Sequence, residues 1–249
     1  GWLAQGAKLH IQDLTAGYAD LPRDVIRGLN LSVPPRYKVG IVGTTGCGKS
    51  SLLLCLLRMI EPRGGKIEIN GINTSTLGLK VLRRTLGLVP QEPMLLTGSI
   101  RTNLDPFDEY TDEQIWESLR QVQLDTEVRK FGDDPLQFQM KAEGGNISFG
   151  QKQLLCIARM VLKQPAVLLL DEATSAIDPS TQEMVQKAIR DMFENSTLVA
   201  IAHRLETIMD FNMIAVMDQG HVIEKGTSEE LMAHKGGVFA RMVSAKRTW

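Results

Sequence analysis

The sequence predicts an α/β fold with a mostly parallel sheet and flanking helices, an N-terminal antiparallel β subdomain and an inserted α-helical subdomain. Three patterns support this. Short apolar runs such as residues 167–170 are typical of buried parallel strands. In the first third, apolar and polar residues alternate as in a half-exposed antiparallel sheet. From Ser99 to Lys130 the helical period dominates, so the middle of the chain is predicted to be mostly helical.

The strands of the first third are bounded by clear turn signals. Residues 9–14 and 25–33 alternate as half-exposed strands do, and residues 38–42 form a shorter, mostly apolar run. Residues 66–70 predict another strand, with Asn70-Gly71 as its hairpin-type turn. These patterns predict an antiparallel sheet followed by a first strand of the buried core.

The rest of the chain alternates between helices and strands. A leucine-rich helix is predicted over residues 50–60, ended by Pro62. Residues 167–170, 198–202 and 213–217 predict buried parallel strands. We therefore interpret 1–249 as one domain, in which residues 93–163 form the helical subdomain and residues 1–92 and 164–249 form the core with its β subdomain.

The composition narrows the possible functions. Of the 249 residues 43% are hydrophobic, which suffices for a folded core. The 28 Lys and Arg residues are balanced by 29 Asp and Glu residues, so a nucleic-acid partner is not expected. No apolar run approaches the roughly 20 residues that span a bilayer, so direct membrane insertion is not expected. Cys47, Cys55 and Cys156 lack metal spacing and are expected to be reduced, cytosolic thiols.

A phosphate-binding motif lies between a predicted strand and a predicted helix. Residues 43–50 read Gly-Thr-Thr-Gly-Cys-Gly-Lys-Ser and match the P-loop, or Walker A, pattern. Its glycines let backbone N–H groups and the helix N-terminus face an anion. Lys49 adds a positive charge for the β- and γ-phosphates, and the Ser50 hydroxyl can bind Mg²⁺. Although a Gly-rich turn could match by chance, the flanking elements favour nucleotide binding.

Two carboxylates follow the apolar strand of residues 167–170. Asp171 and Glu172 would lie at the carboxyl edge of the sheet, where open α/β sheets bind ligands. Asp171 is expected to hold Mg²⁺, and Glu172 to accept a proton from the attacking water or to orient it. The alternative is an ordinary strand end with a polar turn, but behind a P-loop the pattern favours Walker B.

A third motif opens a helix between these two. Residues 146–153 read Asn-Ile-Ser-Phe-Gly-Gln-Lys-Gln, and Ser148 would also be a good helix N-cap. In this order, the three motifs resemble those of the ABC ATPases, with the segment standing for the LSGGQ signature. Ile147 and Phe149 depart from the common Leu and Gly. The resemblance covers nearly the whole chain and implies a P-loop NTPase core.

The resemblance assigns four further residues. Gln91 stands at the Q-loop glutamine, which contacts Mg²⁺ and water, and His203 at the switch histidine, which contacts the γ-phosphate. Asp178 lies in a segment similar to the D-loop. Tyr18 aligns with the aromatic residue that stacks on adenine, although a Tyr at a strand end is more often a packing residue.

The implied site therefore has three groups of residues, with ATP and Mg²⁺ as its ligands. The catalytic group is Glu172, His203, Gln91 and Lys49. The metal ligands are Ser50, Gln91 and Asp171. The nucleotide-binding group is Tyr18, Gly43, Thr44, Thr45, Gly46, Cys47, Gly48, Lys49, Ser50, Ser51, Ser148, Gly150, Gln151 and Asp178.

More narrowly, residues 98–107 are similar to the second nucleotide-binding domain of the multidrug-resistance-associated (C) subfamily. One departure is that Glu143-Gly144-Gly145-Asn146 is one residue shorter than the usual run into the signature, in the segment where these exporters couple to their transmembrane helices. The resemblance implies a second nucleotide-binding domain as partner, expected on the same polypeptide, together with transmembrane domains. It places this chain at the cytoplasmic face of a membrane.

Three functions are compatible with these motifs. The first is ATP hydrolysis by head-to-tail pairs of domains that power transport, expected to be export, across a membrane. The second is a nucleotide-sensing domain that gates an ion channel. The third is a soluble ABC protein of chromosome maintenance or translation. It is disfavoured because the roughly 100 residues between the P-loop and the signature leave no room for a long coiled coil.

Overall fold

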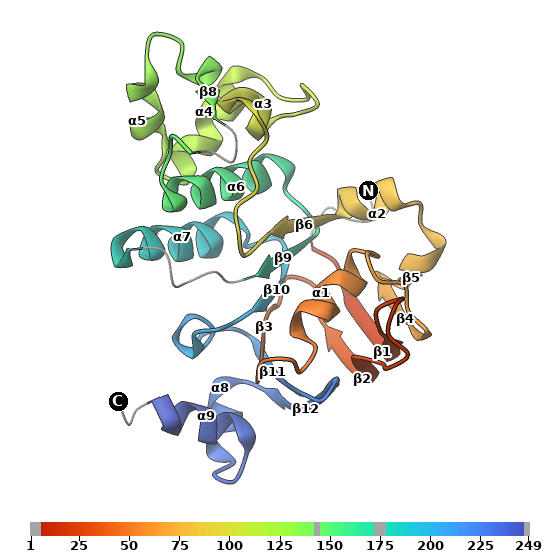
Figure 1. Ribbon diagram of the computed structural model, residues 1–249. Coiled ribbons are helices and arrows are strands. Elements are labelled where there is room, and N and C mark those ends of the chain that lie inside the picture. The colour runs from red at the N-terminus through yellow and green to blue at the C-terminus, as the bar shows by residue number, and fades with distance from the viewer. Residues whose placement is uncertain (1–5, 142–144, 172–177, 247–249) are drawn as a thin grey trace. The chain divides into compact units, whose positions relative to one another are not determined.

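The computed structural model describes residues 6–141, 145–171 and 178–246, shown in Figure 1. Packing divides the chain into two units. The first contains Gly1–Gly87, Pro165–Glu172 and Asn195–Trp249, and the second contains Leu88–Gln164 and Ala173–Glu194. The division groups the helix after residue 178 with the helical segment. The domain boundaries predicted from the sequence stay a prediction, and each unit is described by itself below.

The first unit begins with a four-stranded antiparallel sheet of order β2-β1-β4-β5. Its strands are β1 (Leu9–Ala16), β2 (Ile26–Val33), β4 (Gly64–Ile69) and β5 (Ile72–Asn73). Buried and more exposed residues alternate along β1 and β2, as the sequence predicts. The hairpin turn at Asn70-Gly71 is confirmed, since both residues have a positive φ.

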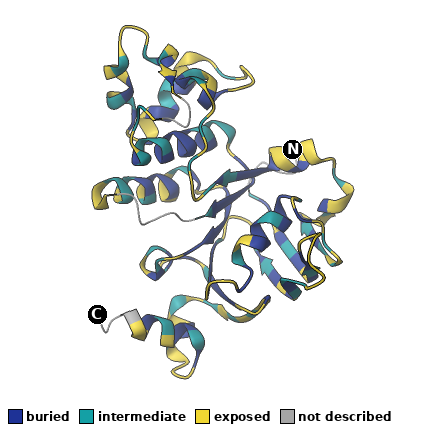
Figure 2. Cartoon of the chain, viewed as in Figure 1, coloured by how far each residue is buried: buried dark blue, intermediate teal, exposed yellow. Residues whose placement is uncertain are grey.

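A six-stranded sheet of order β12-β11-β3-β10-β9-β6 forms the core. Its strands are β3 (Lys38–Gly43), β6 (Leu86–Val89), β9 (Val167–Asp171), β10 (Thr197–Ile201), β11 (Met213–Asp218) and β12 (His221–Gly226). The pairs of β3 with β10 and β11, and of β9 with β10, are parallel, while β12 is antiparallel to β11. All five residues of β10 are buried, and the central strands are dark blue in Figure 2. The predicted α/β fold with two kinds of sheet is therefore confirmed.

The helices of the first unit are short. They are α1 (Lys49–Leu56), α2 (Leu79–Thr85), α8 (Ser228–Ala233) and α9 (Val238–Lys246), with 3₁₀ turns at Thr74–Thr76 and Leu205–Thr207. The prediction that the first helix runs to Ile60 is wrong. Arg58 has a φ of 51°, outside the helical region, and its guanidinium donates to the carbonyl oxygens of Thr74 and Leu77 at 3.2 and 2.6 Å. A contact with a part of the chain that is distant in sequence thus ends the helix early.

The second unit contains the mostly helical segment predicted for the middle of the chain, together with α7 (Pro179–Met192), which lies beyond the predicted bounds of 93–163. The helices of that segment are α3 (Ile100–Leu104), α4 (Asp112–Gln121), α5 (Asp125–Val128) and α6 (Phe149–Lys163), with 3₁₀ turns at Arg129–Phe131 and Pro135–Gln137. A small antiparallel pair, β7 (Gly98–Ser99) with β8 (Gln139–Met140), was not predicted. The helix α6 packs against α3, α4 and α7 through the apolar face that its sequence predicts.

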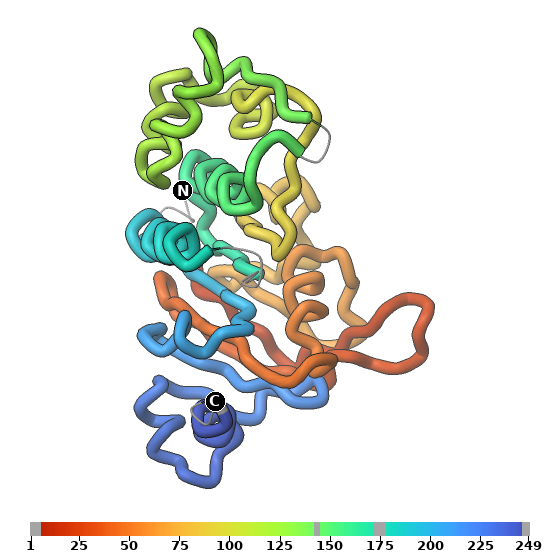
Figure 3. Tube along the Cα trace, turned by 60° about the vertical axis from the view of Figure 1, so that its left-hand side comes forward, coloured from red at the N-terminus to blue at the C-terminus, as the bar shows by residue number. Residues whose placement is uncertain are grey.

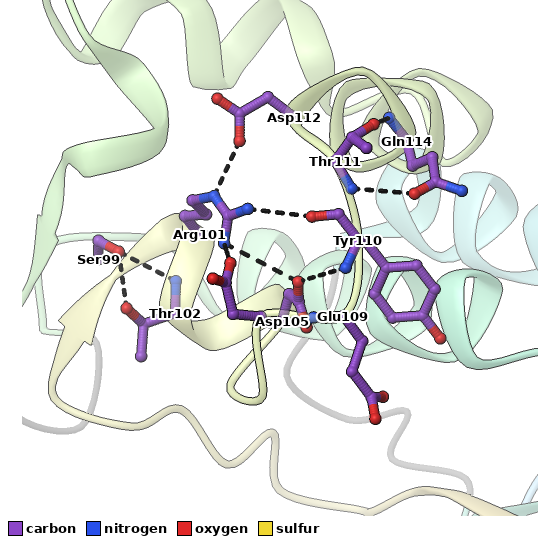
Figure 4. Close-up of polar contacts among 10 residues, drawn as sticks. Ser99, Arg101, Thr102, Asp105, Glu109, Tyr110, Thr111, Asp112 and Gln114 are labelled. Atoms are coloured by element: carbon purple, nitrogen blue, oxygen red, sulfur yellow. Dashed lines mark hydrogen bonds and ion pairs between the residues drawn. The ribbon is translucent and has the colours of Figure 1, made fainter.

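Arg101 organises the turn between α3 and α4, as Figure 4 shows. Its guanidinium donates to Asp112 Oδ1 and Asp108 Oδ1, both at 2.8 Å, and to the carbonyl oxygen of Tyr110 at 3.0 Å. The two carboxylates raise the pKa of Arg101, chiefly through the hydrogen bond to Asp112. Buried Asp105 accepts the Tyr110 amide at 2.9 Å. The segment of residues 98–107 therefore has a structural role in holding this turn.

A side chain of β12 caps the last described helix. Glu224 accepts the amides of Val238 and Phe239 at 2.6 and 3.0 Å, so its two oxygens satisfy N–H groups in the first turn of α9. We expect Glu224→Ala to lower the free energy of unfolding by about 1–2 kcal/mol, the usual worth of such hydrogen bonds. Urea titration measures this. The matched control Glu194→Ala, at an exposed site, is expected to change stability by less than about 0.5 kcal/mol. Equal effects for both variants would contradict the capping role.

Candidate functional site

The P-loop connects β3 to α1, as predicted. Gly46 and Gly48 have φ angles of 82° and 105°, which side chains other than glycine adopt rarely. Lys49 Nζ donates to the carbonyl oxygens of Gly43 and Thr44 at 2.5 and 3.2 Å. The loop is therefore a tight backbone turn with its lysine folded over it. This is the geometry that directs backbone N–H groups toward an anion.

Glycine is required at position 43 because of close packing and not because of its backbone angles. A Cβ atom at this position would lie 2.4 Å from the carbonyl oxygen of Met217 and 2.6 Å from Cys47 Sγ. The neighbouring strand β11 and the loop's own cysteine therefore exclude any larger residue. Cys47 is itself buried, and its carbonyl oxygen accepts the amide of Gly220 at 3.0 Å, so the far side of the loop is anchored to the β11–β12 turn.

Tyr18 lies beside the beginning of α1. Its hydroxyl is 3.0 Å from Ser51 Oγ, and the residue is 39% exposed. The aromatic ring is therefore held next to the P-loop while part of it faces solvent. Such a surface suits the face of a nucleobase, and stacking of this kind is worth about 1–3 kcal/mol.

A cavity of about 470 Å³ adjoins the loop and lies within the usual size of ligand pockets. Residues 44–47 contribute one part of its lining, and residues 23–25 with Arg27, Asp218 and Gln219 contribute the rest. Sequence reasoning missed the two arginines, Arg23 and Arg27. The available signal was their position shortly after Tyr18, but no pattern of spacing marks them.

Asp171 ends β9 at the carboxyl edge of the core sheet. Its backbone pairs with Ile201 of β10, and His203 follows two residues later, so that His203 Nε2 lies 3.9 Å from Asp171 Oδ1. Burial raises the pKa of the Asp171 carboxyl, an effect that the positive charges of His203 and Lys49 partly oppose. The structure thus brings Asp171, His203 and Lys49 to one edge of the first unit. Glu172 lies outside the described residues.

The carboxylate of Asp171 suits a cation. Among the described residues, Asp171 Oδ1 is buried and makes no hydrogen bond. A buried carboxylate oxygen in this state is costly unless something positive satisfies it, and Mg²⁺ prefers oxygen ligands. Since Ser50 lies at the start of α1, next to Lys49, the residues of the first unit fit the predicted metal role.

The signature segment begins α6 in the second unit. Ser148 Oγ accepts the Gln151 amide at 3.1 Å, and Gln151 Oε1 accepts the Ser148 amide at 3.0 Å, which forms a capping box. Ser148 is exposed, whereas Gly150 is buried against α7, where a Cβ atom would lie 2.5 Å from Thr181 Cγ2. The sequence prediction that Ser148 caps this helix is confirmed, and its role toward a nucleotide stays a prediction.

Asp178 is linked to the signature by Thr181, which hydrogen-bonds to Asp178 and packs against Gly150. It caps α7 by accepting the Thr181 amide at 2.9 Å and the Ser180 hydroxyl at 2.5 Å. These hydrogen bonds, led by that of Ser180, lower the pKa of Asp178 from 3.8 to about 2. Its carboxylate is thus committed to the helix cap within the second unit.

The lowered pKa of Asp178 predicts a pH dependence. Because the folded-state pKa lies below the unfolded value of 3.8, the ionised cap stabilises the fold above that value, and its contribution is lost as pH falls toward about 2. The difference in unfolding free energy between the parent and Asp178→Ala should be constant from pH 7 to pH 5 and shrink below about pH 4. Urea titrations at several pH values check this. A difference that grows on acidification would contradict it.

The structure describes Gln91 and part of the short run before the signature. Gln91 follows β6 in the second unit and is exposed, so it is free of the packed core. Of the short run before the signature, Glu143 and Gly144 lie outside the described residues. Asn146 is described, and it donates to the carbonyl oxygen of Gln139 at 3.1 Å and accepts the amide of Lys141 at 3.2 Å.

None of the helices that the structure describes has the length and apolar character needed to cross a membrane.

Comparison with known proteins gives a consistent result. Residues 26–175 match the family model described as ABC transporter. The chain is 40% identical to "ABC transporter C family member 3" of Arabidopsis thaliana, over 98% of this chain and 16% of that protein. It is 44% identical to "ATP-binding cassette sub-family C member 2" of Rattus norvegicus, over 86% of this chain and 14% of that protein. The chain therefore spans about a sixth of the length of these relatives.

A solved structure also resembles the chain. It is titled "Structure of a bacterial Atm1-family ABC exporter with ATP bound", and it superimposes with a TM-score of 0.88 at 30% sequence identity. The match covers 97% of this chain and 42% of the solved chain.

Proposed function

This chain belongs to the ABC transporter family, a family of ATP-hydrolysing proteins, and on that premise we propose that it binds and hydrolyses Mg-ATP as one of two paired nucleotide-binding domains that power transport across a membrane. The observation that carries the proposal is the edge of the first unit where Lys49, Asp171 and His203 meet beside the P-loop. A phosphate cradle, a carboxylate fit for a cation and an imidazole beside that carboxylate together support phosphoryl transfer to water.

Binding is assigned to the P-loop and Tyr18. The backbone N–H groups of residues 48–51 and the positive end of α1 face the phosphates, while Lys49 exchanges its contacts with Gly43 and Thr44 for the β- and γ-phosphates. Tyr18 stacks on the base. These contacts hold the triphosphate chain extended, with its last phosphate toward Asp171 and His203.

Hydrolysis is assigned to Glu172, His203 and Gln91. Glu172 directly follows the strand that ends at Asp171, so its carboxylate takes a proton from the attacking water or orients that water. His203 donates a hydrogen bond to the γ-phosphate, and Gln91 positions water. Mg²⁺, held by Ser50, Gln91 and Asp171, would neutralise charge that develops on the phosphate oxygens.

The signature is assigned to the ATP site of a partner domain. Ser148 is exposed at the N-terminus of α6, a helix of 15 residues whose positive end favours an anion. Gly150 packs against α7, which keeps this end fixed within the second unit. In our proposal Ser148, Gly150, Gln151 and Asp178 complete the partner's site, and the pair closes on two ATP molecules and opens after hydrolysis.

Transport in the export direction and a place at the cytoplasmic face of a membrane belong to the same proposal. The solved relative with a TM-score of 0.88 is titled an exporter, and the C family relative from Arabidopsis thaliana is about six times as long as this chain. Transmembrane domains and a second nucleotide-binding domain, both expected on the same polypeptide, would account for that extra length.

Mixing two inactive variants tests head-to-tail pairing. Lys49→Met removes the lysine that contacts the phosphates in a chain's own ATP site. Ser148→Arg blocks the signature that the chain would contribute to its partner's site. If the chain pairs with itself, an equal mixture of the two should regain about a quarter of the parental ATPase rate, because half of randomly formed pairs contain one intact composite site of two. Each variant alone should show almost none.

Further measurements distinguish pairing of the chain with itself from pairing with a different domain. A parent whose rate rises faster than linearly with protein concentration supports self-pairing. A parent that binds ATP yet never turns it over requires the signature of a different domain. If Ser148→Arg alone hydrolysed ATP at the parental rate, the proposed role of the signature would be wrong.

A further inference from the structure

The loop between β1 and β2 is held in place by one arginine from a distant part of the chain. In Figure 3 this loop, drawn in red to orange, extends away from the strands that it joins. Arg63, which precedes β4, donates through Nη2 to the carbonyl oxygens of Tyr18 and Leu21 at 2.8 and 2.7 Å. Through Nη1 it donates to Asp24 Oδ1 at 2.8 Å. A single guanidinium thus fixes both ends and the middle of the loop.

The position of Arg63 is itself fixed. Its backbone amide donates to the carbonyl oxygen of Thr15 at 2.7 Å, in the strand that enters the loop. Gly17 packs directly against the guanidinium, since a Cβ atom there would lie 2.9 Å from Arg63 Nη1 and 2.8 Å from the carbonyl oxygen of Arg23. The planar fork of an arginine suits three acceptors in a fixed arrangement, which a lysine could not satisfy together.

The same loop contributes to the ATP site at two places. At its start, the Tyr18 hydroxyl is 3.0 Å from Ser51 Oγ, just after the P-loop. At its end, residues 23–25 line the cavity that residues 44–47 of the P-loop also line. Because Arg63 binds the backbone of Tyr18 and the side chain of Asp24, it sets both parts of the loop relative to the P-loop. It lines no part of that cavity itself.

We propose that Arg63 is a positioning residue for nucleotide binding, which orders the loop of residues 17–25 so that the chain recognises the nucleoside part of ATP. The inference rests on the proposed function. Its physical basis is that a loop ordered before binding costs less conformational entropy when the ligand arrives. Arg63 therefore strengthens contacts to the base and ribose, while contacts to the phosphates belong to the P-loop and do not depend on it.

Two ligands separate these contributions. Calorimetry with Mg-ATP and with magnesium tripolyphosphate compares the full nucleotide with its phosphate chain alone. For Arg63→Met, we expect ATP affinity to fall about tenfold, as when a base-stacking contact is lost. Tripolyphosphate affinity should stay within about twofold of the parent, since the P-loop contacts are retained.

A matched variant controls for loss of stability. Arg58 is another arginine of the α1–β4 connection, and it donates to the carbonyl oxygens of Thr74 and Leu77 and to Glu61. Its side chain is more buried than that of Arg63, at 16% against 34% exposed, so its loss should cost at least as much stability. Arg58→Met is nevertheless expected to bind ATP with parental affinity, because Arg58 does not contact residues 17–25.

A second test asks whether Arg63 acts through the loop. In Tyr18→Ala the stacking ring is gone, so adding Arg63→Met should weaken ATP binding much less than it does in the parent. Equal losses in both backgrounds would overturn the inference, as would parental ATP affinity in Arg63→Met. So would equal losses of ATP and tripolyphosphate affinity, which indicate general damage. A parent chain that binds neither ligand would instead contradict the proposed function, and the inference with it.

Discussion

Replacing Lys49 with methionine is expected to abolish ATP binding at millimolar nucleotide and, with it, hydrolysis. The methionine keeps the length and apolar stem of the lysine but removes its charge. In the structure Lys49 Nζ contacts the carbonyl oxygens of Gly43 and Thr44, so it is positioned over the loop that wraps the phosphates. A charge-assisted contact to the β- and γ-phosphates is lost, and we expect affinity to fall at least about 100-fold, or roughly 3 kcal/mol.

The measurement is calorimetric titration with Mg-ATP, with circular dichroism as the test of folding. The matched control is Lys80→Met, which removes an exposed lysine of α2 in the same unit and should bind ATP as the parent does. Parental ATP affinity in a folded Lys49→Met chain would exclude this P-loop as the phosphate site.

The second large effect is expected for Glu172→Gln, which should retain ATP binding but lose turnover. Glutamine preserves the size of the side chain and cannot accept a proton, so a general-base role predicts a rate loss of about 10²–10⁴-fold. Because binding is intact and hydrolysis no longer separates the pair, the variant should also accumulate as a paired species in ATP. Steady-state phosphate release and light scattering with and without ATP measure the two effects.

Glu183→Gln is the control, since it changes an exposed carboxylate of α7 in the same way and should hydrolyse ATP at the parental rate. Hydrolysis by Glu172→Gln as fast as by the parent would show that another group activates the water. Loss of ATP binding in Glu172→Gln would instead assign this carboxylate to binding.

Local patterns were sufficient for most of the fold. The apolar runs that became β9, β10 and β11 are buried parallel strands, and the alternating segments that became β1 and β2 are antiparallel. Ser148 caps α6 with Gln151 as its capping-box partner, which short-range chemistry alone explains. Each of these features has a pattern among residues close together in sequence, so the amino-acid sequence alone is enough to predict it.

Other features depend on contacts between distant residues. The early end of α1 follows from Arg58 reaching Thr74 and Leu77, and the β7–β8 pair joins strands of two residues each from separate segments. Neither feature has a periodic pattern. Periodicity indicates which face of a helix or strand is buried. It does not predict where a single long side chain from elsewhere in the sequence ends a helix or joins two elements.

The sequence by itself predicted the chemistry of the ATP site: the P-loop glycines, Lys49, and the acidic pair Asp171 and Glu172 are recognisable because phosphate binding requires particular residue types at short, fixed spacing. The tertiary structure decided which other residues surround and position these groups. Within the part of the chain that the structure describes, it left Asp171 Oδ1 buried without a hydrogen bond beside His203. It also placed Arg23 and Arg27 along the cavity, and fixed the Tyr18 loop with Arg63. These contacts join residues that packing brings together across tens of positions, and the strength of each depends on distance and burial, which a sequence does not record.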